Sequence, residues 1–241
     1  MKTPLVLAVL LCLSADGCSR KQQSSSASPA TFGAAMVESS GGKQVAAAGM
    51  LLPQPVMVQV NDDQGNGVTG AAVEFSGPRG VVFDPASGVT DSSGQFTTNV
   101  ALGGGAGRYE ITASTLNKSH KQIELKLQEI ALDYQQVLGR RLNEQYCERC
   151  HNPESTPQRV SNYDNLEAKP HAFADGDFYN KMSDDDVTAL ITHGGPALNK
   201  SPAMPPYGFT LSKSDIQALL AFIRAVSDPP YQGRGLVYAE K

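Results

Sequence analysis

The chain has 241 residues, a hydrophobic fraction of 40% and a formal net charge of −4. This length is enough for two domains of roughly 100 residues each. Residues 1–128 hold nine acidic and nine basic side chains, whereas residues 129–241 hold fifteen acidic and eleven basic ones. The excess negative charge therefore belongs to the C-terminal half. This argues against a nucleic-acid partner, because phosphate binding requires clustered Lys and Arg.

The first 17 residues are typical of an export signal. Lys2 supplies a short positive region, residues 5–13 are continuously apolar, and residues 14–17 are mostly small and suit cleavage. The apolar run is too short for a transmembrane helix, which needs about 20 apolar residues. We therefore expect residues 1–17 to be a signal peptide and the mature chain to be exported.

Cleavage before Cys18 resembles a bacterial lipoprotein signal, in which the mature chain starts at a lipidated cysteine. The resemblance implies a lipid anchor on Cys18 at the periplasmic side of a bacterial membrane, and Ser19 favours the outer membrane. Ala15 and Asp16 depart from the lipoprotein pattern. An ordinary signal peptidase could also cleave after Gly17 and leave Cys18 unlipidated.

The region after Cys18 divides into a tether and a β-rich domain. Residues 18–44 are expected to be flexible, because their Ser- and Gln-rich stretch cannot build a core. Over residues 45–128, short runs of alternating apolar and polar residues are separated by turn clusters, which predicts an all-β sandwich. The inward positions of these runs are Val56, Val58, Val60, Ala71, Val73, Phe75, Phe96, Thr98, Val100, Tyr109, Ile111, Ala113, Ile123, Leu125 and Leu127.

The turns and strands of this region resemble the bacterial Ig-like domains of the invasin and intimin type. The matching segments are residues 60–62, 65–68, 70–75, 90–94 and 107–113. The resemblance implies a spacer or a binding module without catalysis. We favour a spacer, because a fold alone does not confer a binding function. His120 is a lone histidine, for which we expect a surface position.

Residues 147–151 read Cys-Glu-Arg-Cys-His. In this pattern the thiols of Cys147 and Cys150 add to the vinyl groups of a haem, and His151 ligates the iron. Two intervening residues on a helical turn place both sulfurs over one edge of the ring. The motif therefore predicts one covalently bound haem c.

Two other readings of the motif find less support. A dithiol redox motif would need a βαβ context, which the surrounding pattern lacks. A zinc site would need two further ligands at short range. His171 and His193 could serve, but there is no second Cys-x-x-Cys and no His-x₃-His.

The residues around the motif predict helices. Apolar spacing predicts a helix over 131–150, Ser183 is expected to cap a second helix, and Ser212 with Asp215 forms a capping box for the last. This layout resembles class I cytochromes c, which implies an all-α domain over residues 129–230, with a tail over 231–241. The resemblance also implies that the first and last helices pack together beside the haem.

The same resemblance makes Met204 the sixth ligand, because the Ala-Met-Pro-Pro segment before a capped helix matches the family's ligand loop. Met182, His171 and His193 are the alternative ligands. Two further alternatives are an open sixth position and a Met204 that is only a core residue. The family usually gives the proximal histidine a carbonyl partner from a proline-containing turn, which leaves Pro153 and Pro157 open. Candidate donors to the haem propionates are Arg140, Arg159, Lys200 and Tyr207.

With both axial positions filled by His151 and Met204, no small-molecule substrate is expected at the iron. The sequence therefore predicts an electron carrier rather than an enzyme. Its redox partner is expected to have a basic docking face that complements the negatively charged C-terminal half. Two alternatives remain. The chain could be the haem subunit of a periplasmic oxidoreductase, or a surface binding or sensing protein whose Ig-like domain recognises a partner.

Overall fold

The structure is a computed structural model that describes residues 31–157 and 159–233. The predicted signal peptide, Cys18 and the first part of the tether lie outside these residues. The strands are β1 (Ala35–Ser40), β2 (Val45–Ala47), β3 (Val56–Asn61), β4 (Ala72–Ser76), β5 (Val82–Asp84), β6 (Ser87–Val89), β7 (Gln95–Ala101), β8 (Gly107–Leu116) and β9 (Gln122–Leu132). The helices are α1 (Tyr134–Tyr146), α2 (Glu148–His151), η1 (Tyr163–Asn165), α3 (Gly176–Tyr179), α4 (Asp184–His193), η2 (Gly195–Leu198) and α5 (Lys213–Val226).

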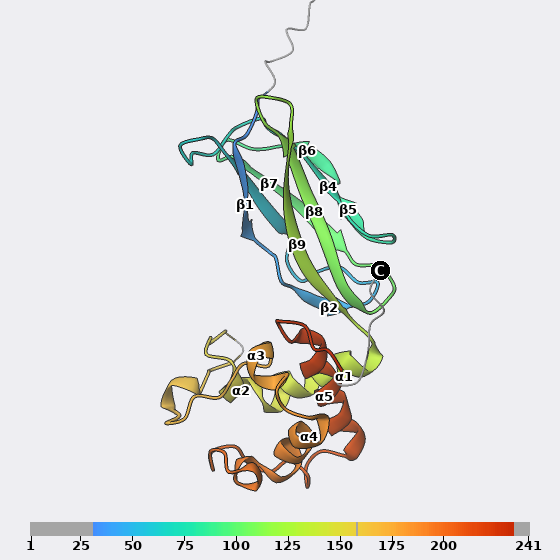
Figure 1. Cartoon of the computed structure of the whole chain (residues 1–241), viewed down its shortest axis with the longest axis vertical. Helices are drawn as coiled ribbons and strands as arrows, with labels where there is room; N and C mark the ends of the chain where they lie inside the picture. Colours follow the sequence, from blue (N-terminus) through green and yellow to red (C-terminus); the bar gives the residue numbers. More distant parts are fainter. Residues whose placement is uncertain (1–30, 158, 234–241) are drawn as a thin grey trace, which may run out of the picture. The chain divides into compact units, whose positions relative to one another are not determined.

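The strands form the predicted β-sandwich (Figure 1). One sheet has the order β1-β3-β7-β5 and the other the order β2-β9-β8-β4-β6. Neighbouring strands are antiparallel, except that β2 runs parallel to β9. The long antiparallel pair of β8 and β9 forms the centre of the larger sheet.

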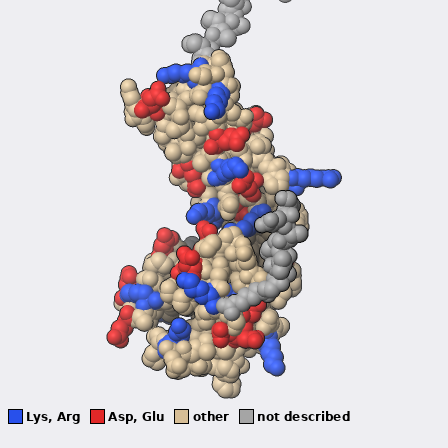
Figure 2. All heavy atoms as spheres, in the orientation of Figure 1, with Lys and Arg blue, Asp and Glu red and all other residues tan. Residues whose placement is uncertain are grey.

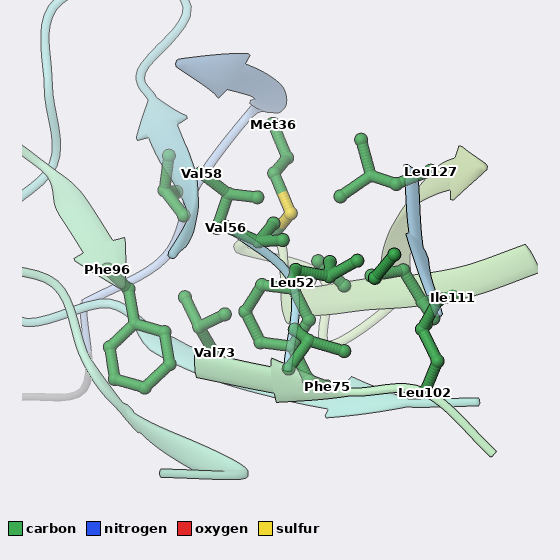
Figure 3. Close-up of a cluster of buried hydrophobic side chains, with 14 of the residues drawn as sticks. Met36, Leu52, Val56, Val58, Val73, Phe75, Phe96, Leu102, Ile111 and Leu127 are labelled. Carbon is green, nitrogen blue, oxygen red and sulfur yellow. The ribbon is translucent and has the colours of Figure 1, made fainter. Parts of the chain in front are cut away.

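Alternation of apolar side chains explains why these segments are strands. In β3 every second residue is fully buried, because successive side chains on a strand point to opposite faces. The inward side chains of the two sheets meet in one core, part of which Figure 3 shows. Its members include Val56, Val58, Val73, Phe75, Phe96 and Ile111. His120 is exposed in a turn, as predicted.

Both predicted boundaries of the sandwich need correction. Residues 35–40, which the sequence places in the tether, form β1 and pair with β3. At the other end β9 continues to Leu132, so residues 129–132 belong to the sandwich and not to the helical domain. Local composition did not reveal β1, because only one of its six residues is buried.

A single residue separates the sandwich from the helices. Asp133 follows β9 and caps α1 through a capping box with Gln136. The helix predicted over 131–150 is therefore shorter, and Cys147 separates it from α2. The capping boxes predicted at Ser183 and Ser212 are both present, at the starts of α4 and α5.

The helical region has its own apolar core. The buried stripe of α5 contributes Ile216, Leu219, Leu220 and Ile223, and α4 contributes Val187 and Ile191. A smaller cluster joins Ile130 and Leu132 of β9 to Phe222 and Val226 of α5. Among the residues described, no helix combines the length and apolar character that crossing a bilayer requires.

Candidate functional site

The end of α1 delivers the Cys-x-x-Cys-His motif. Cys147 is the C-cap of α1, and its carbonyl accepts hydrogen bonds from the amides of Cys150 (3.0 Å) and His151 (2.9 Å). This turn brings the two thiols and the imidazole together, as the spacing predicts. Glu148 is held from outside by Asn143 (3.2 Å) and by an ion pair with Arg159 (3.4 Å).

A cavity of about 290 Å³ opens beside the motif. Cys147, Cys150, His151 and Met204 all line it, so the structure brings together residues that are 57 positions apart in the sequence. The rest of the wall is mainly apolar. It includes Leu166, Pro170, Phe173, Val187, Leu190, Ile191, Pro205 and Ile223.

The orientation of His151 is set by a backbone carbonyl. Its Nδ1 lies 2.7 Å from the carbonyl oxygen of His171. A nitrogen that donates to a carbonyl must carry the proton, so Nε2 is left with the lone pair that a metal ion needs. Burial lowers the pKa of His151, which also favours the neutral ring. The partner is thus the residue after Pro170, and neither Pro153 nor Pro157 supplies it.

Met204 lies in a loop that folds back on the end of α4. The amide of Gly195 donates to the Met204 carbonyl (3.0 Å), and the amide of Tyr207 donates to the Ile191 carbonyl (3.0 Å). A Cβ on Gly195 would lie 1.9 Å from the carbonyl oxygen of Ser201, so this loop fits only beside a glycine. The Met204 side chain is therefore held on a rigid backbone at the cavity.

The alternative axial ligands are placed less favourably. Met182 packs in the helical core and is not among the residues that line the cavity. His193 is exposed in the last turn of α4. His171 lines the cavity, but its ring Nδ1 is bonded to Asp175 (2.7 Å) and its face stacks on Phe178 at 3.8 Å.

Cys147 and Cys150 are free cysteines, and the surroundings of Cys147 disfavour its thiolate. Burial, followed by the proximity of Cys150 and Glu148, raises the pKa of Cys147 to about 12. A dithiol redox motif needs the opposite shift, because the thiolate is its nucleophile. Within residues 31–157 and 159–233 there is also no group of three or more Cys, His, Asp or Glu that could hold a metal ion. The raised pKa of Cys147 therefore does not suit a dithiol redox motif.

Of the predicted propionate donors, Lys200 and Tyr207 line the cavity. Tyr207 already donates its hydroxyl to the Tyr146 carbonyl (2.9 Å). Arg140 is turned toward the Val45 carbonyl (2.7 Å), and Arg159 contacts the backbone and carboxylate of Glu148. Lys169, which the sequence analysis did not select, also lines the cavity.

Two aromatic residues beside His151 carry no signal in the sequence. The Phe173 ring lies 4.9 Å from the His151 ring, and Tyr179, which is 3% exposed, donates to the His171 carbonyl at 3.2 Å. No periodic pattern marks them, because the segment between α2 and α4 is largely irregular.

Residues 135–223 match the family model described as cytochrome C oxidase, cbb3-type, subunit III. This part of the chain is a cytochrome c domain. Residues 44–127 match the model of bacterial Ig-like domains of group 1. The chain therefore joins an Ig-like domain to a cytochrome c domain, as the sequence predicts.

Several solved structures resemble parts of this chain. The D00-D0 domain of intimin is 17% identical, with 43% of this chain and 48% of that one covered and a TM-score of 0.33. Invasin, titled a bacterial integrin-binding protein, is 16% identical. The match covers 40% of this chain and 19% of invasin, with a TM-score of 0.31. The adhesin InvE of Yersinia pseudotuberculosis is 15% identical. The match covers 42% of this chain and 32% of InvE, with a TM-score of 0.29.

The chain spans less than half the length of each of these structures. Likenesses this distant carry no conclusion about what this chain does. No curated protein matches the sequence.

The cytochrome c domain carries covalently bound haem c. The residues present fit this group. Two free cysteines lie next to an imidazole whose Nε2 is free for a metal, and a largely apolar cavity adjoins them. A thioether lines the same cavity. The haem supports a role in electron transfer.

Proposed function

We propose that this protein is an exported mono-haem cytochrome that transfers single electrons, with His151 and Met204 as axial ligands. One observation carries the proposal. The cavity that receives the motif is also lined by Met204, while the hydrogen bond from Nδ1 of His151 leaves its Nε2 free. When bound, the haem supplies a one-electron couple, whose reduced state a methionine ligand favours.

The protein's own residues have three tasks in this mechanism. Cys147 and Cys150 hold the group by covalent bonds. The His171 carbonyl orients the imidazole of His151 at 2.7 Å. The apolar wall excludes water from the site, which further tunes the potential. If His151 and Met204 both hold the iron of the bound haem, a substrate would have to displace Met204, and so we assign electron exchange rather than catalysis.

The axial ligands are tested by absorption spectra of oxidised and reduced protein, produced with a cytochrome c maturation system. Wild type is expected to be low-spin, with the weak far-red iron–sulfur band. Met204→Ala should lose that band. Met182→Ala is the matched control, because Met182 lies in the same domain but does not line the cavity. A wild type without the band, or an unchanged Met204→Ala spectrum, would remove Met204 from the iron.

We also propose export and membrane attachment, with the periplasmic side of the outer membrane favoured. The N-terminal 17 residues and Cys18 support this, by their resemblance to lipoprotein signals. Mass spectrometry of the mature N-terminus in the membrane fraction tests it. A lipidated Cys18 is expected, and Cys18→Ser should release the protein into the soluble fraction. An unmodified N-terminus in wild type would reject the anchor.

The proposed redox partner has a basic docking face. The net charge of −4 over residues 129–241 supports this sign. On the face shown in Figure 2, acidic and basic side chains are interspersed and do not form one large patch of a single sign. We therefore expect electrostatic steering to be moderate, with an exchange rate that falls as salt is raised. An electron-exchange rate that increases with salt would contradict a partner of opposite charge.

A second candidate is a haem subunit of a larger oxidoreductase. The family description favours it, because it names a subunit of an oxidase. Mild solubilisation of membranes, followed by size separation with detection of haem, distinguishes the two. Co-migration with a larger redox complex supports the subunit, whereas a haem signal at the size of the single chain supports the free carrier.

A further inference from the structure

The carbonyl oxygen of His171 accepts two hydrogen bonds. One comes from Nδ1 of His151 at 2.7 Å, and the other from the Tyr179 hydroxyl at 3.2 Å. The same hydroxyl lies 3.5 Å from Nδ1 of His151. A carbonyl has two lone pairs, so it can accept both donors at once. The proximal imidazole and a buried phenol therefore share one acceptor.

We infer that Tyr179 is a positioning residue that weakens the hydrogen bond from His151 to the His171 carbonyl and thereby raises the haem potential. This rests on the proposed function, because it requires His151 to be the iron ligand. Partners of the outer shell make a ligating imidazole more electron-donating by accepting its N–H. A carbonyl whose electron density is already drawn toward a second donor is a poorer acceptor.

The phenol is held where this effect requires it. Tyr179 is 3% exposed, at the end of α3. Its ring packs edge-on against Phe173 (5.7 Å, 89°) and Phe178 (5.1 Å, 88°). Burial raises the pKa of Tyr179 above its ordinary value, so the hydroxyl remains a proton donor.

The backbone of Tyr179 is tied to the last helix. The Arg224 guanidinium, on α5, donates to the Tyr179 carbonyl (2.6 Å) and to the Met182 carbonyl (2.9 Å). It also forms an ion pair with Asp184 at 2.9 Å. The α3 turn is thus attached to α5. In turn, α5 packs against α1, which directly precedes the haem-binding motif. These contacts hold the backbone of Tyr179, and Phe173 and Phe178 hold its ring.

Removing the hydroxyl alone is the test, in the full-length holoprotein. In Tyr179→Phe the ring can stay in place, and the His171 carbonyl then serves His151 only. The imidazole should donate more electron density and favour the oxidised state. The equilibrium constant for reduction by a reference carrier should fall roughly threefold to tenfold, where tenfold corresponds to 59 mV for a one-electron couple. The His151 Nδ1 proton should move downfield in the NMR spectrum of the reduced protein.

Tyr109→Phe is the matched control. Its hydroxyl also donates to a backbone carbonyl, that of Gly105 (2.7 Å), but in the Ig-like domain. The Tyr109→Phe variant should leave the haem potential unchanged. The far-red iron–sulfur band must persist in Tyr179→Phe, since its loss would place the effect on Met204 and overturn the inference. A potential that is unchanged or higher also overturns it. A wild-type protein without low-spin covalent haem would instead reject the proposed function, on which this inference rests.

Discussion

Gly139 of α1 lies directly against the backbone of Ala218 of α5. A Cβ on Gly139 would stand 2.0 Å from the Ala218 carbonyl oxygen and 2.7 Å from the Cβ of Phe222. No side chain fits there unless the two helices separate. Because α1 ends at Tyr146 and Cys147 follows it directly, this contact also sets where the haem-binding motif lies relative to α5.

We therefore expect Gly139→Ala to destabilise the cytochrome c domain. Overpacking of this kind costs about 1–3 kcal/mol, which exceeds the ~1 kcal/mol that alanine gains in helix propensity. Urea unfolding followed by the helical circular-dichroism signal measures it. Gly104→Ala is the control, since a Cβ there would meet no atom within 4 Å. Equal urea midpoints for Gly139→Ala and Gly104→Ala would contradict the close contact between α1 and α5.

Gly195→Ala is expected to weaken the attachment of Met204. The new Cβ would stand 1.9 Å from the Ser201 carbonyl oxygen and push away the loop that carries Met204. An internal ligand that is held less well competes less strongly with an external one. Added imidazole should therefore bind the oxidised variant roughly threefold or more tightly than wild type. Spectroscopic titration of both proteins checks this, and equal affinities would mean that Gly195 does not support the ligand loop.

Glu129 makes the stability of the Ig-like domain depend on pH. Its carboxyl is fully buried; Oε2 accepts from the Gln44 amide at 2.6 Å, and Oε1 has no partner among the described residues. Burial raises its pKa to about 7, with a further rise from Glu38, against the opposing effect of the Gln44 and Lys43 amides. Since the folded pKa exceeds the ordinary value of 4.5, ionisation opposes folding.

The stability should therefore fall as pH rises from about 4.5 through 7, by about 3 kcal/mol in all. Glu129→Gln should remove most of this loss, with little effect at pH 5 and a clear stabilisation at pH 8. Urea unfolding of both proteins at the two pH values measures it. Glu124→Gln, on an exposed position of the same strand, should follow wild type. Parallel pH profiles for wild type and Glu129→Gln would show that Glu129 does not ionise in this range.

Arg108 connects β8 to the C-terminal end of α5. Its guanidinium donates to the carbonyls of Ala225 (3.3 Å) and Ser227, and Ser227 is fully buried. Arg108→Ala would leave these carbonyls without that donor, at a cost of about 1–3 kcal/mol. We expect the variant to unfold in two separated thermal steps, or to be cleaved earlier near Asp133 by a protease. Lys126→Ala, which removes an exposed ion pair with Glu110, is the control and should behave as wild type.

The sequence by itself determined the parts whose chemistry is local. The alternation in β3 predicted a strand, Ser183 and Ser212 predicted helix starts, and the spacing from Cys147 to His151 predicted the cofactor. Each depends on residues a few positions apart, because side-chain period and capping are set within one or two turns of the chain.

Only the tertiary structure decided the contacts between distant segments. The partner of His151 is the carbonyl of residue 171 and not a nearby proline turn, and β1 comes from a segment without a strand pattern. The need for glycine at position 139 comes from the close approach of α5, which no nearby residue in the sequence indicates. Backbone carbonyls and close approaches carry no residue-type signal. They depend on how whole elements pack, and a local pattern cannot encode that.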